Sequence, residues 1–405
     1  MKKPLQLAAF LCGCLLATTA FAAPGKEPGF KFGNGWTLLP QVSLGLFWES
    51  NARDTVNDEE SGGGWRVQPS FSLNYELNRT RLGINGFYTL ERGFDDEDAQ
   101  DTDSYGVSFA LLRELGARWN LSLSASYVHS EDDEFYGEGW DLNNPMAFRV
   151  ETDESDNYTV NGALGYTSAK WQASIGFGWS RQDYDDDWNN TSDSYNVSLM
   201  GGRAIGQNTF WNLSVTGQWD DPTHGDTSLA YYIMTGVSGD LSRKLSYSVM
   251  VGLGIYDFDG ADGYSSDTEY GPSYSASLSY KINKTFALSL SLNSRYEAEY
   301  AGYADCYYVW SHNLAAGLNA QWTDKFSSSL RLAAFYEDHI SSDARGGSDN
   351  DRTYYQVVLG SSYRFNRYMS LNGSISWKND QYDYGQSGDD SSDDFRADIG
   401  LTFTF

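Results

Sequence analysis

Hydrophobic and polar residues alternate along most of the chain from Trp36 to its end. Three segments show this clearly, with apolar residues at Leu82-Ile84-Gly86-Tyr88-Leu90, Trp119-Leu121-Leu123-Ala125-Tyr127 and Trp171-Ala173-Ile175-Phe177-Trp179. The residues between them are mainly Ser, Asn, Gly, Thr and Gln. A period of two predicts β-strands with one apolar and one polar face. Aromatic residues at both ends of a strand and aliphatic residues in its middle are typical of strands that cross a bilayer.

The last residues carry the same pattern to the end of the chain. Ile399, Leu401, Phe403 and Phe405 alternate with polar or small residues, and the chain ends on the aromatic. This ending resembles the terminal strand of Gram-negative outer-membrane β-barrel proteins, and the whole chain resembles barrels of the porin type. The resemblance implies an integral outer-membrane protein that meets lipid and lipopolysaccharide, depends on the barrel assembly machinery, and is a monomer or a homotrimer.

Short and long connectors alternate between the predicted strands. Short ones lie near Asn78-Arg79, Gly116-Ala117-Arg118, Ser168-Ala169-Lys170, Gly206-Gln207-Asn208, Ser242-Arg243-Lys244, Ile282-Asn283-Lys284, Thr323-Asp324-Lys325 and Asn366-Arg367. Long ones lie near 51–64, 92–103, 131–155, 184–192, 221–227, 258–268, 299–306, 340–352 and 380–392. This alternation predicts an all-β, antiparallel, up-and-down transmembrane barrel of about 18 strands, with a range of about 16 to 18, because bacterial barrels have tight periplasmic turns and longer outer loops.

The first residues predict export from the cytoplasm. A basic start, Met1-Lys2-Lys3, precedes an apolar run and the small-residue cleavage site Ala20-Phe21-Ala22. Residues 1–22 therefore form a predicted secretory signal peptide, 23–35 a periplasmic lead-in, and 36–405 a single barrel domain.

The acidic charge of the chain is concentrated in the long connectors. The formal net charge is -27, which argues against nucleic acid as a partner. Clusters such as Asp95-Asp96-Glu97-Asp98 lie in long connectors, whereas the short turns favour Lys and Arg. We therefore expect the acidic end to face outward, where Ca²⁺ or Mg²⁺ could bridge it to lipopolysaccharide. No other cofactor is expected.

One acidic connector suggests a divalent-cation site. Asp183, Asp185 and Asp187 have the opening spacing of a calcium loop, but no turn Gly follows and Ser194 stands where an EF-hand has its bidentate Glu. This excludes an EF-hand. Two interpretations remain, a solvated acidic surface and a weak site for a divalent cation at these three residues.

Assigning the polar positions to the inside predicts a lumen of small neutral residues with a few charges. The expected pore-lining charged residues are Arg66, Arg81, Glu91, Arg295, Glu297, Arg331, Glu337, Arg364, Arg396 and Asp398. Small side chains leave a barrel of this width open, which favours an aqueous channel. The charges suit either ion pairs that rigidify the wall or a filter that selects solutes. The expected membrane-interface aromatics are Trp119, Tyr127, Trp171, Trp179, Phe286, Phe403 and Phe405.

Catalysis is not expected from the sequence. Asp338-His339 and Ser311-His312-Asn313 supply suitable residue types, but consecutive residues of a strand point to opposite faces. The first functional hypothesis is a porin-like channel for passive diffusion of small hydrophilic solutes through a Ser, Asn and Arg-lined lumen. The alternatives are a conduit for exopolysaccharide export and a structural or adhesive barrel without transport.

The longest connector suggests a constriction inside the barrel. Residues 131–155 include Trp140, Pro145, Met146 and Phe148, which suit a fully solvated loop poorly. We expect this loop to fold into the barrel, so that deleting 135–148 raises single-channel conductance.

Overall fold

The computed structural model describes residues 28–33, 35–50, 61–94, 102–130, 155–184, 191–223, 227–258, 267–301, 305–340, 350–383 and 389–405. Its elements are β1 (Phe30–Phe32), β2 (Trp36–Glu49), β3 (Gly62–Leu77), β4 (Thr80–Gly93), β5 (Thr102–Glu114), β6 (Trp119–Ser130), β7 (Ser155–Thr167), β8 (Trp171–Tyr184), β9 (Ser192–Ala204), β10 (Thr209–Pro222), β11 (Ser228–Ser242), β12 (Leu245–Phe258), β13 (Asp267–Lys281), β14 (Phe286–Ala301), β15 (Asp305–Gln321), β16 (Phe326–Ile340), β17 (Asn350–Asn366), β18 (Met369–Asp383) and β19 (Asp389–Thr404). No helix in this part of the chain has the length and hydrophobicity of a membrane span.

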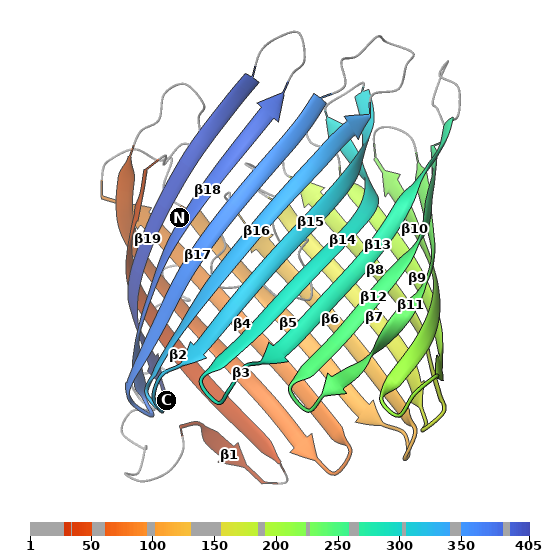
Figure 1. Ribbon diagram of the computed structural model, residues 1–405. Helices are drawn as coiled ribbons and strands as arrows, with labels where there is room; N and C mark the ends of the chain where they lie inside the picture. The colour runs from red at the N-terminus through yellow and green to blue at the C-terminus, as the bar shows by residue number, and fades with distance from the viewer. Residues whose placement is uncertain are drawn as a thin grey trace.

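Strands β2 to β19 form one closed antiparallel barrel (Figure 1). Each strand pairs with its neighbour in sequence, and β19 returns to β2 with Arg396 opposite Glu49 and Thr404 opposite Gln41. The predicted all-β barrel and its eighteen strands are confirmed. Residues 30–32, inside the predicted lead-in, instead form β1, which pairs with the start of β2. Closure gives every strand of the barrel a neighbour on both sides, so no strand is a free edge along its whole length.

The outer face of the barrel is apolar and exposed, as the alternation predicts. In β2, Leu44, Leu46 and Trp48 are 46%, 54% and 45% exposed, whereas Phe47 between them is 5% exposed and lies inside. Every second side chain of a strand lies on the same face, so the outward residues of all strands form one continuous apolar belt. Such a belt is stable in lipid and would aggregate in water.

The short turns join neighbouring hairpins through their basic side chains. The Lys244 ammonium donates to the Ile282 carbonyl of the next short turn at 3.0 Å, and Lys325 donates likewise to Phe365 at 3.3 Å. Asn78 has φ 53°, a left-handed conformation that Asn tolerates better than most residues and that suits its two-residue turn. The Lys and Arg of these turns therefore also satisfy backbone carbonyls that the barrel end leaves unpaired.

Several predictions fall outside the described residues. They include the signal peptide at 1–22, the proposed constriction loop within 131–154, and Asp185 and Asp187 of the cation-site hypothesis. Several predicted long connectors are shorter than expected, because strands extend into 92–103, 299–306, 340–352 and 380–392. Beyond the bilayer both faces of a strand can be polar, so the alternation that marks a strand fades while its backbone pairing continues.

Candidate functional site: the charged inner wall

Charged side chains on the inner face of the barrel gather on one side. Most of them come from β2 to β4 and from β13 to β19, which are continuous around the closed barrel, whereas Asp220 of β10 lies apart from them. The facing strands β6 to β9 carry no charged residue at their described inner positions, which are mostly Ser, Asn, Gln, Thr and Gly. Inner-face residues follow from the alternation with exposed apolar residues such as Phe177 and Leu199. The lumen is therefore polar all round, and its charges lie mainly along one wall.

A network of two arginines and three carboxylates spans the seam where the barrel closes. The Arg396 guanidinium lies 3.1 Å from Glu91, 3.4 Å from Asp398 and 3.9 Å from Glu49. Arg66 lies 3.3 Å from both Glu91 and Asp398. The network thus joins β2, β3, β4 and β19. Most of its members alternate along their strands with exposed apolar residues such as Trp65 and Ile399, so the network lies on the inner face.

The Arg396 side chain is the most enclosed cation of this network. Its side chain is 10% exposed, and its guanidinium lies 4.8 Å from the centroid of the Phe47 ring. Burial of an arginine is costly unless carboxylates pair with it and satisfy its donors. Three carboxylates and one aromatic face meet that requirement here, so the network stabilises the junction of the first and last barrel strands.

A second charged cluster lies nearer the long-connector end, on β16 to β19. The Arg352 guanidinium contacts Asp380 at 2.6 Å and Glu337 at 3.8 Å, and the Asp380 side chain is 5% exposed. The Lys378 ammonium lies 5.8 Å from the centroid of the Tyr354 ring. Lys378 is also register partner of Asp394, and both residues are almost fully buried. This cluster and the seam network are neighbours on the inner face, and together they place paired positive and negative side chains along the same wall.

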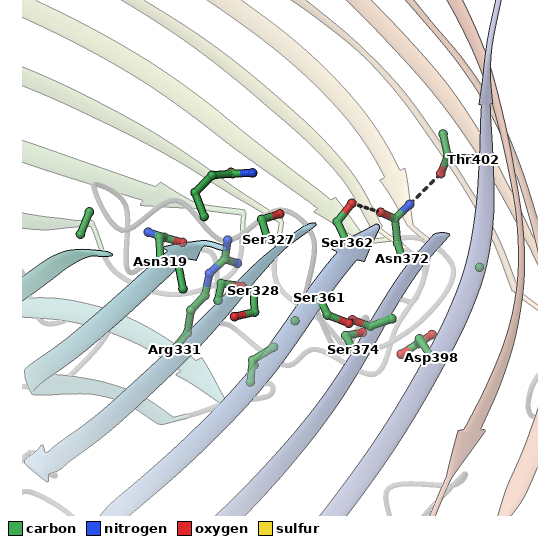
Figure 2. A pocket seen from close by; sticks show the side chains of 18 of the residues that line it. Asn319, Ser327, Ser328, Arg331, Ser361, Ser362, Asn372, Ser374, Asp398 and Thr402 are labelled. Carbon is green, nitrogen blue, oxygen red and sulfur yellow. Dashed lines mark hydrogen bonds between the residues drawn. The ribbon is translucent and has the colours of Figure 1, made fainter. Parts of the chain in front are cut away.

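A polar cavity of about 820 Å³ lies against this wall toward the short-turn end (Figure 2). Hydroxyl and amide groups line most of it. The Asn372 amide accepts from the Ser362 hydroxyl at 2.8 Å and donates to the Thr402 hydroxyl at 3.0 Å. Its charged lining residues are Arg66, Lys281, Lys284, Arg331 and Asp398, four cations and one anion. The cavity is therefore lined by small polar groups with an excess of positive charge.

The structure brings part of the predicted pore-lining set together. Arg66, Glu91, Arg396 and Asp398 form the seam network, and Glu337 belongs to the second cluster. Arg331 lines the cavity, and Arg295 lies on β14 at an inner-face position. Arg81 pairs with Glu76 at 3.1 Å at the short-turn rim, where both are 71% exposed. Arg364 donates to the Asp324 carbonyl at that same rim. The Glu297 side chain lies outside the described residues.

Sequence reasoning missed Glu49, Arg352, Lys378, Asp380 and Asp394. Arg352 and Asp380 lie in stretches predicted to be connectors, where no inner face could be assigned. Lys378 carried a usable signal, since it continues the inward parity of Ser374 and Ser376. Glu49 lies at the end of its strand, and only strand closure places it beside Arg396. Pairing between distant strands, not local pattern, decides these contacts.

The predicted interface aromatics lie on the outer face. Trp119 and Trp171 are 47% and 53% exposed, and the Arg203 guanidinium lies over the Trp171 ring at 5.5 Å. Trp179 donates from its indole nitrogen to Asp193 at 2.9 Å, and the Tyr127 hydroxyl donates to Asp156 at 2.8 Å. Phe286, Phe403 and Phe405 are half-buried. The Phe405 amide donates to the Pro40 carbonyl at 3.0 Å, so the terminal residue also joins the barrel closure.

Of the proposed cation site, only Asp183 lies among the described residues. Asp183 accepts from Thr191 at 2.8 Å and from Arg181 at 3.2 Å. No group of three His, Cys, Asp or Glu suited to a metal occurs among the described side chains.

The Ser311-His312-Asn313 motif has its first two side chains turned apart. Ser311 donates to the Arg295 carbonyl, whereas His312 accepts from or donates to the Tyr274 hydroxyl through Nδ1 at 2.7 Å. These two residues therefore lie on opposite faces of β15.

An unpredicted pair, His129 and Asp156, lies on the outer face near the long-connector end. His129 Nδ1 lies 2.9 Å from Asp156 Oδ1, and the imidazole stacks on Tyr105 with centroids 4.6 Å apart. The two residues are register partners on β6 and β7. The pair extends the aromatic girdle and faces away from the lumen.

Comparison with known proteins places the chain among barrels. Residues 31–248 match the model of the Omp85 superfamily domain, and residues 152–363 match a protein family of unknown function, DUF481. No curated protein matches the chain.

Several solved structures are similar to the chain at low identity. OprD of Pseudomonas aeruginosa is 11% identical, with 95% of this chain and 98% of that one covered at a TM-score of 0.44. The outer membrane protein OpdK of the same organism is 10% identical, with 91% and 99% covered at 0.46. The FrpB iron transporter of Neisseria meningitidis is 10% identical, with 93% and 83% covered at 0.45.

The family matches and the fold agree on one conclusion. Each family model covers more than half of the chain, and the two overlap over 152–248. The structure adds a closed antiparallel barrel with a continuous apolar outer face. The chain therefore belongs to the bacterial outer-membrane β-barrel proteins, within the families described as Omp85 superfamily domain and DUF481, and is an integral protein of the outer membrane.

Proposed function

We propose that this barrel is a channel for passive diffusion of small hydrophilic solutes. The polar cavity of about 820 Å³ carries the proposal. Its lining consists of side chains such as Ser329, Asn319 and Thr402, which are too short to meet across a barrel of eighteen strands. Water and polar solutes are the natural occupants of a space lined by hydroxyl and amide groups.

The one-sided charge suggests how a solute would pass. On one wall it meets alternating charges that are paired with each other, as in the seam network. On the other it meets neutral hydroxyl and amide groups such as Ser124 and Asn196, which line a second cavity of about 650 Å³. Paired charges give a weak net electric field in the lumen. Neutral and zwitterionic solutes would therefore pass without strong attraction or repulsion by the wall. The basic excess around the first cavity favours anions over cations at the short-turn end.

The test is conductance of the purified barrel in planar bilayers, with reversal potentials measured across a salt gradient. We expect stable ion-conducting steps and a modest preference for anions. Swelling of liposomes in sugars of increasing size gives the solute cutoff independently of charge. A folded wild-type barrel that neither conducts nor admits small sugars refutes the channel and favours a structural or adhesive barrel.

A second candidate is export of an anionic glycan. The four cations Arg66, Lys281, Lys284 and Arg331 around the first cavity favour it, because spaced cations suit a polymer of carboxylate sugars. Uronic-acid oligomers added from the short-turn side should then block the conductance at low concentration. Block by the oligomer but not by neutral oligosaccharides of equal length supports export, and equal block by both supports the simple channel.

A further inference from the structure

Strands β13 and β14 pair only over the halves that lie nearer the short turns. Their register runs from Lys281 opposite Ala287 to Ser275 opposite Asn293 and ends there. β13 nevertheless continues to Asp267 in pairing with β12, and β14 continues to Ala301 in pairing with β15. The wall is therefore divided between these two strands toward the long-connector end.

Beyond this point β14 passes inside the barrel. Tyr296 has the parity of Leu290 and Leu292, each 38% exposed on the outer face, yet Tyr296 is only 4% exposed. It packs against Tyr232 and Tyr256. Those two tyrosines lie on the inner face, since the residues beside Tyr232, Tyr231 and Ile233, are 41% and 48% exposed outside. The outer face of β14 thus rests on the inner face of β11 to β13, an overlap that we call the lap.

The lap is a small hydrophobic core between two layers of the barrel wall. Ala230, Tyr232, Tyr256 and Tyr296 form a buried cluster, and the Trp310 ring stacks on Tyr296 with centroids 6.0 Å apart. Gly254 and Gly271 lie under the Tyr296 ring. A Cβ atom at Gly254 would stand 3.2 Å from that ring, and one at Gly271 would collide with its hydroxyl group. Because Gly254 and Gly271 have no side chains, the Tyr296 ring can pack directly against the backbone of β12 and β13.

Hydrogen bonds replace the missing strand pairing. The Tyr232 hydroxyl accepts from the Tyr296 amide at 3.0 Å and donates to the Tyr296 carbonyl at 2.8 Å. One side chain of β11 therefore satisfies both backbone groups that a neighbouring strand would otherwise pair. We call this contact the Tyr232 clasp. Without this contact a buried backbone amide and carbonyl would have no strand partner, which destabilises a folded chain.

A proline lies just beyond the point where the pairing of β13 and β14 ends. Ser294 Oγ donates to the Pro272 carbonyl at 3.2 Å, so the backbone of Pro272 faces β14. Proline has no amide hydrogen to offer a partner strand and is found at strand edges. The Ser294 hydroxyl also accepts from the Tyr274 amide at 3.2 Å, so this side chain joins β13 and β14 where their backbone pairing ends. Pro272 thus offers no amide with which β13 could continue its pairing with β14.

We propose that the lap narrows the pore and that the Tyr232 clasp holds it in place. The hairpin of β14 and β15 occupies lumen that a regular eighteen-strand wall would leave open, and it carries Arg295 on the face turned to the interior. The proposal rests on the channel function proposed above. It assigns the constriction to a strand hairpin and its Arg295, in place of a folded-in loop.

The experiment compares single-channel conductance and the liposome-swelling cutoff of wild type with Tyr296→Ala and Tyr232→Phe. Tyr296→Ala removes the ring that fills the lap, and we expect conductance to rise roughly twofold, since flux follows the open bore of the pore. Tyr232→Phe keeps the ring but removes both clasp bonds, so we expect a smaller rise with frequent transitions to the wider state. Tyr231→Phe, on the outer face of the same strand, is the matched control and should conduct like wild type.

The conductance results separate a failure of the proposed lap from a failure of the proposed channel. Folding is checked by the shift in electrophoretic mobility between unheated and heated barrel. A folded Tyr296→Ala barrel with wild-type conductance and cutoff overturns the lap as the constriction. If Tyr296→Ala does not assemble, Tyr232→Phe decides, and wild-type behaviour of that variant overturns the proposal. A wild-type barrel that does not conduct refutes the channel function itself. A conducting wild type with unchanged Tyr296→Ala and Tyr232→Phe variants refutes only the role of the lap.

Discussion

Arg396 offers the most decisive test of the charged wall. Replacing it with Met keeps much of the side-chain volume but removes the cation that three carboxylates share. Arg66 then remains as the one cation of the network, in contact with Glu91 and Asp398, and the network changes from one excess negative charge to two. Removing one partner of a buried ion pair costs about 3 to 5 kcal/mol, because the remaining charge is left without compensation. We expect the free energy of unfolding to fall by at least about 3 kcal/mol on this basis.

The cost should depend on the carboxylates, not on lost packing. Adding Glu91→Gln to Arg396→Met removes one uncompensated charge, so the double variant should be more stable than the sum of the two single losses by about 0.5 to 3 kcal/mol. Arg364→Met is the matched control. That side chain is exposed at the short-turn rim, so the expected change is within about 0.5 kcal/mol.

The measurement is urea unfolding of the barrel in lipid vesicles, followed by tryptophan fluorescence. The same preparations give reversal potentials, which should shift toward cations in Arg396→Met because the seam has lost a positive charge. The reasoning fails if Arg396→Met is as stable as Arg364→Met. It also fails if the losses from Arg396→Met and Glu91→Gln simply add.

Three further predictions test other parts of the molecule. Deleting Phe405 removes the amide that bonds the Pro40 carbonyl at the closing seam, and we expect less heat-modifiable barrel in outer-membrane fractions, whereas Phe405→Tyr should assemble normally. Ser124→Lys places a cation on the neutral wall, where it stays solvated; it should shift the reversal potential toward anions while changing stability by less than about 0.5 kcal/mol, and an unshifted potential would place Ser124 off the ion path. Gly271→Val should disturb the lap like Tyr296→Ala, because its side chain collides with the Tyr296 hydroxyl; a conductance below wild type would contradict this.

Local pattern is enough to predict the strands and much less useful for the contacts between them. The period of two places Leu44 outside and Arg66 inside, because a strand has only two faces. Arg352 and Asp380 lie in stretches whose composition predicts connectors, and their 2.6 Å contact needs the register of β17 and β18. The clearest trace of the lap in the sequence is Pro272 within a strand, which indicates an edge but not which strand overlaps it.

By itself, the sequence determined the barrel, the approximate number of its strands and the face on which most side chains lie. These properties follow from alternation and connector length, which are local along the chain. Tertiary structure alone decided that the charges gather on one wall, that Arg396 joins the first and last strands, and that β14 slides inside β13. Each of these depends on which residues of distant strands lie opposite each other, and closure of the barrel fixes that register.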